Sequence, residues 1–458
     1  MRATNLNYKL YQAAFVASLC VVLVAAGRVV VSSFSLTLLL LAVSSVTALF
    51  LLARTRPALP LTTAFFALAF IPVYWVPYED HIFPDPGVMI MFIVVVGAAA
   101  NALLLSRRVT LSSMDVLIGL FFVASLASVV LGIRKRGDLT TNLLQWLVPY
   151  IAARYLVGGR VSYTSFARIF CAAALLMLPF VFVESATGFN PFHELVVQPG
   201  LGEVWGHEIF RDGQPRAAAS FGHPIALSMF LVAAAILAFV LAFHTEVARR
   251  RGAWLAGSGL LVVGAALTFS RTGWIMLLAA LICGVLAVVS NPALRAIRTR
   301  VVWVSSAAAI AIGLAMVFSA SANESILSVF GSDHEAATSA QARENILAAS
   351  NQYLSWFGRE TDTLREVGIK SVDNTYVYLT LQWGVVAAAL FALMAVPMVV
   401  YLVRQRRQLS MDGALVVVAL ASLIGLIFVA PITQEQNVVF MLLGAASAVL
   451  VRASRRRA

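Results

Sequence analysis

Residues 221–243 read FGHPIALSMFLVAAAILAFVLAF, a stretch without a single Asp, Glu, Lys or Arg. About 20 consecutive apolar residues are enough for an α-helix to cross a bilayer. Similar stretches recur along the 458-residue chain, in which 61% of residues are hydrophobic and 12% are charged. Soluble domains carry about 25% charged residues, so this composition excludes a soluble globular enzyme, a disordered chain and a coiled coil. The sequence predicts an all-α, polytopic helical membrane protein.

Fourteen stretches are candidate transmembrane helices. They lie near residues 11–27, 30–53, 59–76, 87–105, 114–133, 139–157, 161–184, 221–243, 253–269, 273–290, 301–320, 374–402, 412–431 and 436–451. The span at 139–157 is the least apolar, and the tight pair within 11–53 widens the expected number to 12–14. No convincing cleavage site follows the N-terminal MRATNLNYK, which indicates an uncleaved first helix. We expect a single integral membrane domain over residues 1–458.

The distribution of charge predicts the orientation. An even number of spans places both termini on one side, and with the N-terminus inside, the inner segments hold 22 of the 33 Lys and Arg residues. Only three of the 21 acidic residues fall on that side. Because cytoplasmic loops of membrane proteins are rich in Lys and Arg, both termini are expected in the cytoplasm. The net charge of +12 then reflects orientation in a lipid bilayer, and nucleic-acid binding is not expected.

Two outer loops, near 185–220 and 321–373, are longer than ordinary connections between helices. Long loops in a compact fold are usually functional or disordered. We expect these two loops to form the active-site face. The second loop contains SAQARENILAASNQYLSWF (339–357), whose apolar residues recur at roughly helical spacing and predict an amphipathic helix on the membrane surface.

Three arginines stand on the outer side, where basic residues are scarce. Arg271 follows a span directly in LTFSRTGW, Arg216 lies five residues before Phe221, and Arg343 lies in the candidate surface helix. Guanidinium groups bind phosphate bidentately and stay charged. Together they are suited to a lipid-linked diphosphate sugar, and they could stabilise the departing diphosphate without a metal. The alternative for each is a side chain that snorkels to the interface or forms a loop ion pair.

A second group of candidate residues lies in SVDNTYVYLTLQWG (371–384), where the long loop re-enters the membrane. Asp373 could accept a proton from an attacking sugar hydroxyl as a general base. Asp373 and Asn374 could equally cap the helix that follows. Tyr376 and Tyr378 are candidate sugar contacts. Aromatic residues are also common at membrane interfaces, and the interfacial interpretation of these two tyrosines is favoured.

Other polar positions give weaker signals. The outer segment YEDHIFPDP (78–86) could bind a divalent metal or supply a pair of catalytic acids, but an acidic solvated turn is favoured. His223, in FGHP, is a candidate contact for phosphate or a hydroxyl group. The chain has no P-loop, GxSxG, HExxH or convincing DxD motif, so no cofactor, nucleotide or metal site is assigned. The cysteines Cys20, Cys171 and Cys283 lie far apart in apolar runs and indicate no disulfide framework.

Four motifs in this order resemble the O-antigen ligase and Wzy-type polymerase superfamily. They are RAAASFGHP (216–224), FSRTG (269–273), QARENI (341–346) in a long outer loop, and DNTYVYL (373–379) followed by Trp383 and Gly384. The resemblance covers about residues 200–400. The motifs are short and degenerate, and their order and spacing are more specific than any one of them.

The resemblance implies a GT-C-type, metal-independent, inverting glycosyltransferase in the bacterial cytoplasmic membrane. Such enzymes use polyprenyl-diphosphate-linked oligosaccharides on the outer face, and other polysaccharide assembly proteins are candidate partners. By position, Arg216 and Arg271 match the family's functional arginines, and Arg343 matches a further one. Ligases carry a histidine before the re-entry asparagine, whereas this chain has Asp373 before Asn374. That departure favours a polymerase-like relative. The family core of about twelve spans agrees with fourteen if one pair is added at the N-terminus.

Three functions therefore stay open from the sequence. The first is a polymerase that joins lipid-linked glycan units. The second is a ligase that transfers the glycan to a lipid, a cell-wall polymer or a protein. The third is a transporter or lipid-glycan flippase, which is less favoured because transporters place ionisable residues near mid-membrane, whereas here polar residues gather at the outer ends of the spans.

Overall fold

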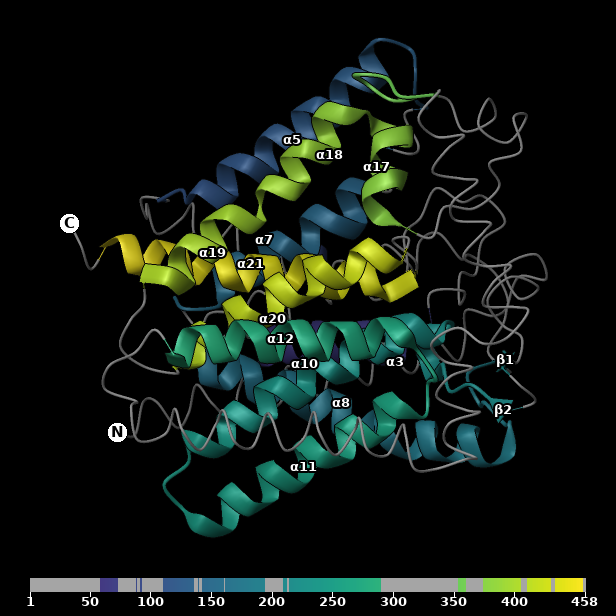
Figure 1. Ribbon diagram of the computed structural model, residues 1–458, viewed down its shortest axis with the longest axis vertical. Coiled ribbons are helices and arrows are strands. Elements are labelled where there is room, and N and C mark those ends of the chain that lie inside the picture. The colour runs from purple at the N-terminus through teal and green to yellow at the C-terminus, as the bar shows by residue number, and fades with distance from the viewer. Residues whose placement is uncertain are drawn as a thin grey trace, which may run out of the picture.

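The computed structural model describes residues 58–72, 88, 91–92, 110–135, 139, 142–159, 161–193, 209–211, 214–289, 353–359, 374–404, 410–429 and 433–455. These residues form helices with one short hairpin (Figure 1). The helices in the first half of the chain are α3 (Ala58–Phe70), α5 (Ser113–Val130), the π-helical η1 (Leu143–Leu147), α7 (Val148–Leu156) and α8 (Tyr163–Thr187). The hairpin pairs β1 (Phe210–Arg211) antiparallel with β2 (Gln214–Pro215).

The remaining described elements are helical. They are η3 (Ala219–Phe221), α10 (Pro224–Phe243), α11 (Ala248–Ala266), α12 (Arg271–Val289), α17 (Thr375–Trp383), α18 (Val385–Leu393), α19 (Ala395–Arg404), α20 (Met411–Gly425), η5 (Leu426–Phe428) and α21 (Thr433–Arg455). Two of these, η3 and η5, are single 3₁₀ turns.

Six helical stretches are long and apolar enough to cross a membrane. They are Ser113–Val130, Tyr163–Thr187, Pro224–Phe243, Val385–Arg404, Met411–Phe428 and Gln434–Arg455. Two shorter apolar stretches, Leu61–Phe70 and Arg271–Cys283, accompany them. The chain is therefore a helical, multi-pass membrane protein. The predicted spans 11–27, 30–53 and 301–320, and nearly all of 87–105, lie outside the described residues.

The centre of the bundle is formed by α10, α20 and α21, with α5 and α18 on one flank and α11 on the other (Figure 1). In its most apolar stretch, 83% of the residues of α10 are buried, against 39% for α5. The exposed side chains of α5 include Val116, Leu120, Val123 and Val130, an apolar row suited to contact with lipid tails. Composition alone does not separate the two helices, because burial inside protein and burial in lipid favour the same residues.

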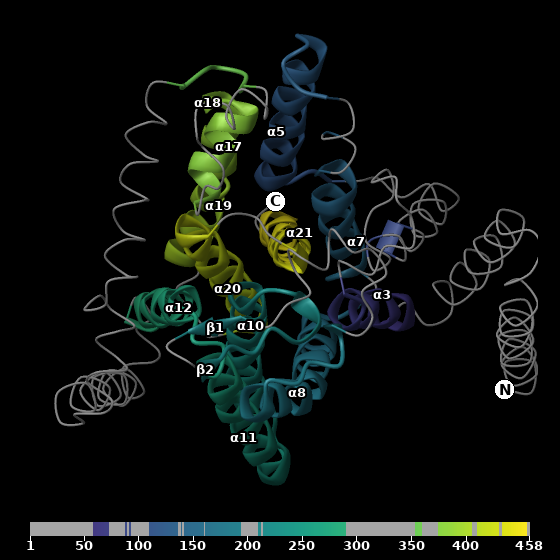
Figure 2. The same ribbon diagram turned by 90° about the vertical axis from the view of Figure 1, so that its right-hand side faces the viewer.

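Polar contacts gather at two opposite ends of the bundle. One, here called the Arg154 end, joins the starts of α8 and α20 to the end of α21: Tyr163 Oη donates to Ala448 O at 3.2 Å, and Arg452 lies 3.8 Å from Asp412. The other, the Arg216 end, joins η3 and α3 to the start of α21 through Gln434. Figure 2 views the bundle from the side of the β1–β2 hairpin, with α21 between α20 and α7.

The predicted span 374–402 is not one continuous helix: α17 is separate from the membrane-spanning stretch Val385–Arg404, which contains α18 and α19. The span breaks at Gly384, whose φ of +94° is unfavourable for residues with a side chain. Residues 353–359 pack into the break, where Val385 N donates to Ser355 O at 2.9 Å and Arg359 N donates to Leu381 O at 2.8 Å. A Cβ atom at Gly384 would lie 2.2 Å from Trp356 O. As a result, α17 runs across the direction of α20 and α21, and α18 continues beside α5 (Figure 1).

Candidate functional site

The segment that carries Arg216 is held in place by a buried carboxylate at the end of α8. Glu184, 4% exposed, accepts hydrogen bonds through Oε2 from the backbone N–H groups of Ala218 and Ala219 at 3.0 and 2.7 Å. Asn190 Nδ2 donates to Glu184 Oε1 at 2.8 Å and to Ala219 O at 3.0 Å. Ala219 has a φ of +48°, a conformation that costs free energy for alanine. These bonds offset that cost and fix the path of the chain after Arg216.

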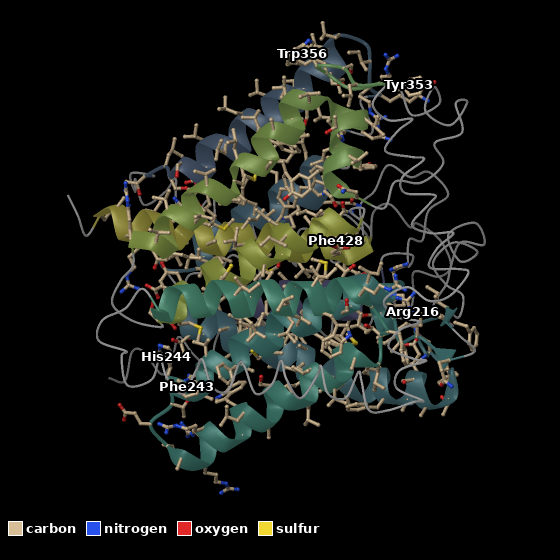
Figure 3. All side chains as sticks on the ribbon, in the orientation of Figure 1. Arg216, Phe243, His244, Tyr353, Trp356 and Phe428 are labelled. Carbon is tan, nitrogen blue, oxygen red and sulfur yellow. The ribbon has the colours of Figure 1, made fainter. Side chains whose placement is uncertain are left out.

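Arg216 is joined to the turn that precedes Arg271. Its side chain is half-buried, and Nε donates to Thr268 O at 3.0 Å. The next residue, Ala217, donates its N–H to Leu267 O at 3.4 Å. That turn ends at Arg271, the first residue of α12, which is also half-buried. The structure thus brings Arg216 and Arg271 to the same end of the bundle, where Figure 3 labels Arg216.

His223 lies between these two arginines in the sequence and caps α10. Its Nδ1 accepts a hydrogen bond from Ile225 N at 3.2 Å, and Pro224 occupies the first turn, where a missing N–H is tolerated. The start of α10 packs closely on the start of α12, because a Cβ atom at Gly273 would lie 2.9 Å from Ser228 Cβ. His223 and Arg271 therefore begin two neighbouring helices at the Arg216 end.

Asn374 caps α17, as one of the two interpretations from the sequence predicted. Its Oδ1 accepts from Tyr376 N at 2.9 Å and from Val377 N at 3.1 Å. Thr375 Oγ1 donates to Val429 O at 2.6 Å, which fixes the start of α17 against the end of η5. Tyr376 Oη donates to Leu423 O at 3.0 Å, so its hydroxyl is engaged within the protein. Asn374 thus lies at the Arg216 end with the two arginines.

Other predicted site residues lie outside the described part of the chain. They are Asp373, Arg343 and the acidic segment 78–86. Within the described residues, no three His, Cys, Asp or Glu side chains gather where they could hold a metal ion. The described site is consequently a set of arginine, histidine and amide side chains at one end of the helical bundle.

A polar run at the same end of the bundle was not among the site residues predicted from the sequence. Residues 433–437 read TQEQN and form the start of α21, where the predicted span began only at residue 436. Gln434 Nε2 donates to Ser220 O at 2.9 Å, and Ser220 lies in the segment between Arg216 and His223. Five successive polar residues leading into an apolar span are unusual in lipid, and this is the signal that could have identified the run.

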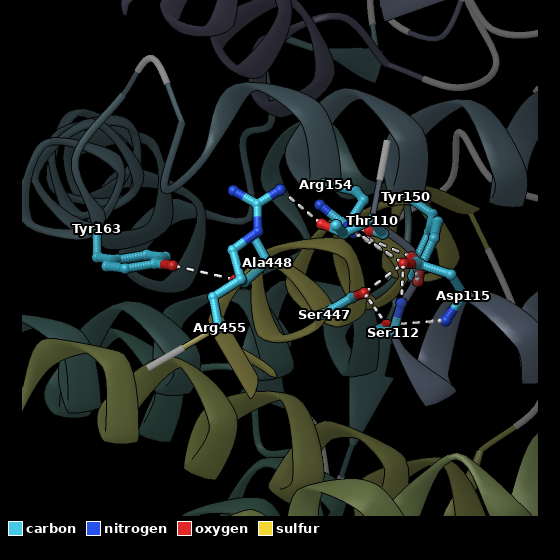
Figure 4. A network of polar contacts seen from close by, with 9 residues as sticks. All are labelled: Thr110, Ser112, Asp115, Tyr150, Arg154, Tyr163, Ser447, Ala448 and Arg455. Atoms are coloured by element: carbon cyan, nitrogen blue, oxygen red, sulfur yellow. Dashed lines mark hydrogen bonds and ion pairs between the residues drawn. The ribbon is translucent and has the colours of Figure 1, made fainter. Parts of the chain in front are cut away.

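The Arg154 end carries a polar network of a different kind (Figure 4). Asp115 Oδ1 accepts from Tyr150 Oη at 2.6 Å, from Arg154 Nε at 3.0 Å and from Ser447 Oγ at 2.9 Å. Its Oδ2 accepts from Ser112 N at 2.7 Å and from Arg154 Nη2 at 3.0 Å. Every carboxylate oxygen has partners, so this network ties α5, α7 and α21 together and offers no open acceptor for a ligand.

No protein-family model matches the chain, and the comparison with curated proteins also found no match. The functional assignment of the Arg216 end therefore depends on its own residues and on the motifs that contain them.

Proposed function

We propose that this protein is a polymerase-like inverting glycosyltransferase that joins polyprenyl-diphosphate-linked glycan units on the outer face of the bacterial cytoplasmic membrane. The observation that carries the proposal is the link between Arg216 and the turn before Arg271. Two permanently charged guanidinium groups at the end of a membrane bundle are suited to a diphosphate whose lipid lies in the bilayer.

In the proposed reaction, a hydroxyl group of one lipid-linked glycan attacks the anomeric carbon of another. The bond from that carbon to the diphosphate oxygen breaks, and the diphosphate leaves with the bonding electron pair. Arg216 and Arg271 stabilise the negative charge that develops on it, as fixed donors do at other sites of developing charge. His223, Asn374 and Tyr376 are proposed substrate contacts near them, with Arg343 as a further one. Asp373 is proposed either to take the proton of the acceptor hydroxyl as a general base or to orient that hydroxyl.

The orientation belongs to the same proposal, with the Arg216 end outside and the Arg154 end in the cytoplasm. The described Arg154 end includes Arg249, Arg250 and Arg251 at the start of α11 and Arg452 and Arg455 at the end of α21. Such clustering is typical of the cytoplasmic side. With an even number of spans, both termini then lie in the cytoplasm. A GT-C-type arrangement of the helices is part of the same proposal.

A deletion strain tests the proposal. Envelope polysaccharide from this strain, complemented with wild type or with Arg271→Ala, is separated by gel electrophoresis. The proposal expects long polymer with wild type and single repeat units with the deletion and with Arg271→Ala at equal protein level. Normal polymer in the Arg271→Ala strain would contradict it.

The ligase alternative uses the same two arginines and differs in the acceptor. Mass spectrometry of the reducing end separates the two functions, because a polymerase product keeps polyprenyl diphosphate and a ligase product carries another anchor. If chain length is unchanged while polymer accumulates on its carrier lipid, the ligase is favoured. Accumulation of repeat units on the inner leaflet would instead favour a flippase.

A further inference from the structure

The start of α21 contains an acidic side chain that the proposed reaction has not used. Glu435 is 1% exposed, and neither of its carboxylate oxygens has a hydrogen-bond partner among the described residues. Its neighbours in the sequence are engaged: Gln434 Nε2 donates to Ile71 O at 3.1 Å, and Gln436 Nε2 donates to Gln145 Oε1 at 2.7 Å. Of these three side chains, only that of Glu435 makes no hydrogen bond with the residues that the structure describes.

Burying a carboxylate without a hydrogen-bond partner lowers the stability of the folded protein. Burying a polar group without a hydrogen bond costs about 1–3 kcal/mol, and an unpaired charge costs more. The position of Glu435 as the third residue of α21 lowers that cost for the ionised form, since the positive end of a helix dipole stabilises negative charge. Nothing in the packing requires an acid, because glutamine has the same shape. A buried acid kept at such a cost within a membrane helix points to function.

The contacts of the neighbouring residues show which way Glu435 faces. Gln434 contacts the end of α3 and η3, and Gln436 contacts Gln145 and Trp146 of η1. Consecutive residues of an α-helix point about 100° apart. Glu435 therefore points neither toward η3, as Gln434 does, nor toward η1, as Gln436 does, but toward the side of α21 that lies away from α7. On that side of α21 lie α20 and α10 (Figure 2). Both helices pack against α21, and α10 is the helix that His223 caps.

We propose that Glu435 is the catalytic base of the glycosyl transfer, and that the acceptor hydroxyl binds beside the start of α21. This inference rests on the proposed function. The hydroxyl proton passes to Glu435 as the oxygen forms its bond to the anomeric carbon, and the diphosphate departs with the electron pair of the broken bond. Because the side chain is nearly fully buried, the ends of α10, α20 and α21 must part when the acceptor enters, a movement typical of active sites that close over substrate.

Exclusion of water is part of the proposed role. A carboxylate shielded from water interacts more strongly with a hydroxyl group than a solvated one does. Shielding also keeps water from replacing the acceptor, since water at the same carboxylate would hydrolyse the lipid-linked donor. Asp373 would then orient the acceptor rather than take its proton.

Purified protein in proteoliposomes tests the inference, with lipid-linked repeat units extracted from the deletion strain as substrate. General bases contribute about 100-fold or more to rate, so Glu435→Gln is expected to lose at least that factor in polymer formation. Glu435→Asp keeps a carboxylate and is expected to retain part of the rate, with an altered dependence on pH. Both proteins should still be stabilised against heat by the repeat units, because the arginines that hold the diphosphate are intact.

Thermal unfolding separates a catalytic role from a structural one. Without substrate, Glu435→Gln is expected to be as stable as wild type or more stable, because the substitution removes an unpaired buried acid. The matched control is Glu246→Gln, at an exposed glutamate of the Arg154 end, which should keep the wild-type rate. Polymer formation by Glu435→Gln at the wild-type rate, or a loss of its thermal stability, would overturn the inference and leave the proposed function standing. If wild type itself forms no polymer, the proposed function fails and the role of Glu435 falls with it.

Discussion

Asp115 and Glu435, two acidic residues at opposite ends of the bundle, differ in how their carboxylates are paired. At the Arg154 end, both carboxylate oxygens of Asp115 accept hydrogen bonds, from Tyr150 and Arg154 of α7 and from Ser447 of α21. At the Arg216 end, Glu435 has none among the described residues, although Glu184 nearby is fully engaged in holding the Arg216 segment. Under the proposed function, the network at the Arg154 end serves stability, whereas the polar groups at the Arg216 end serve substrate.

The largest effect is expected at the Arg216 end, from Arg271→Ala. Loss of one fixed donor to a developing negative charge costs about 100- to 1,000-fold in rate. The polymer in the gel assay should collapse to single repeat units while the amount of protein in the membrane stays at the wild-type level. Arg249→Ala, at an exposed arginine of the Arg154 end, is the matched control and should give normal polymer. Equal polymer loss in both variants would remove the distinction between the ends.

At the Arg154 end, Asp115→Ala should act on stability. The change leaves Arg154 and Tyr150 without their shared acceptor. Because this charge pair is only partly buried, its loss costs less than the about 3–5 kcal/mol of a fully buried pair. We expect a clearly lower unfolding temperature in detergent, with a normal rate per folded molecule. A low rate in the folded fraction would show that the network also serves the reaction.

A smaller effect is expected from Asn374→Ala. Loss of this helix cap costs about 1 kcal/mol, because the N–H groups of Tyr376 and Val377 lose their acceptor. Asn374→Asp can still cap the helix and should restore the unfolding temperature. If the aspartate variant recovers stability but not polymer formation, Asn374 contacts substrate in addition to capping α17.

The smallest effect is expected from Arg455→Ala. Arg455 Nη2 donates to Thr110 Oγ1 at 2.6 Å on the exposed surface of the Arg154 end. Exposed polar contacts of this kind contribute about 0–1 kcal/mol. Both the unfolding temperature and the polymer should stay close to wild type. A large loss of stability would show that the network of this end extends to its surface.

The sequence predicted the helical, membrane-spanning character because long apolar runs have few other solutions. The hydropathy pattern did not predict the residue at which each span begins. The start of α21 includes Gln434 and Glu435, which a hydropathy pattern assigns to a loop. The break at Gly384 was likewise hidden, since apolar residues flank it on both sides and only the packing of residues 353–359 shows why the helix stops there.

For the candidate site, sequence motifs named the residues and the structure supplied their connections. The link from Arg216 to Thr268 joins positions 52 residues apart, and no local pattern encodes it. The cap at Asn374 follows from residue type and was predicted as one of two roles. The role of Glu184 could not be predicted, because its partners are backbone groups of a segment more than 30 residues away.

The break at Gly384 has a consequence for membrane insertion. At 1.5 Å per residue, the nine residues of α17 extend about 14 Å, less than half of the roughly 30 Å hydrocarbon core. The 20 residues from Val385 to Arg404 are enough to cross it alone. During synthesis, only this second stretch would be inserted across the bilayer. The helix α17 is therefore added to the bundle without reversing the direction of any later span. In this way a membrane protein can gain a short helix while the orientation of all later spans stays the same.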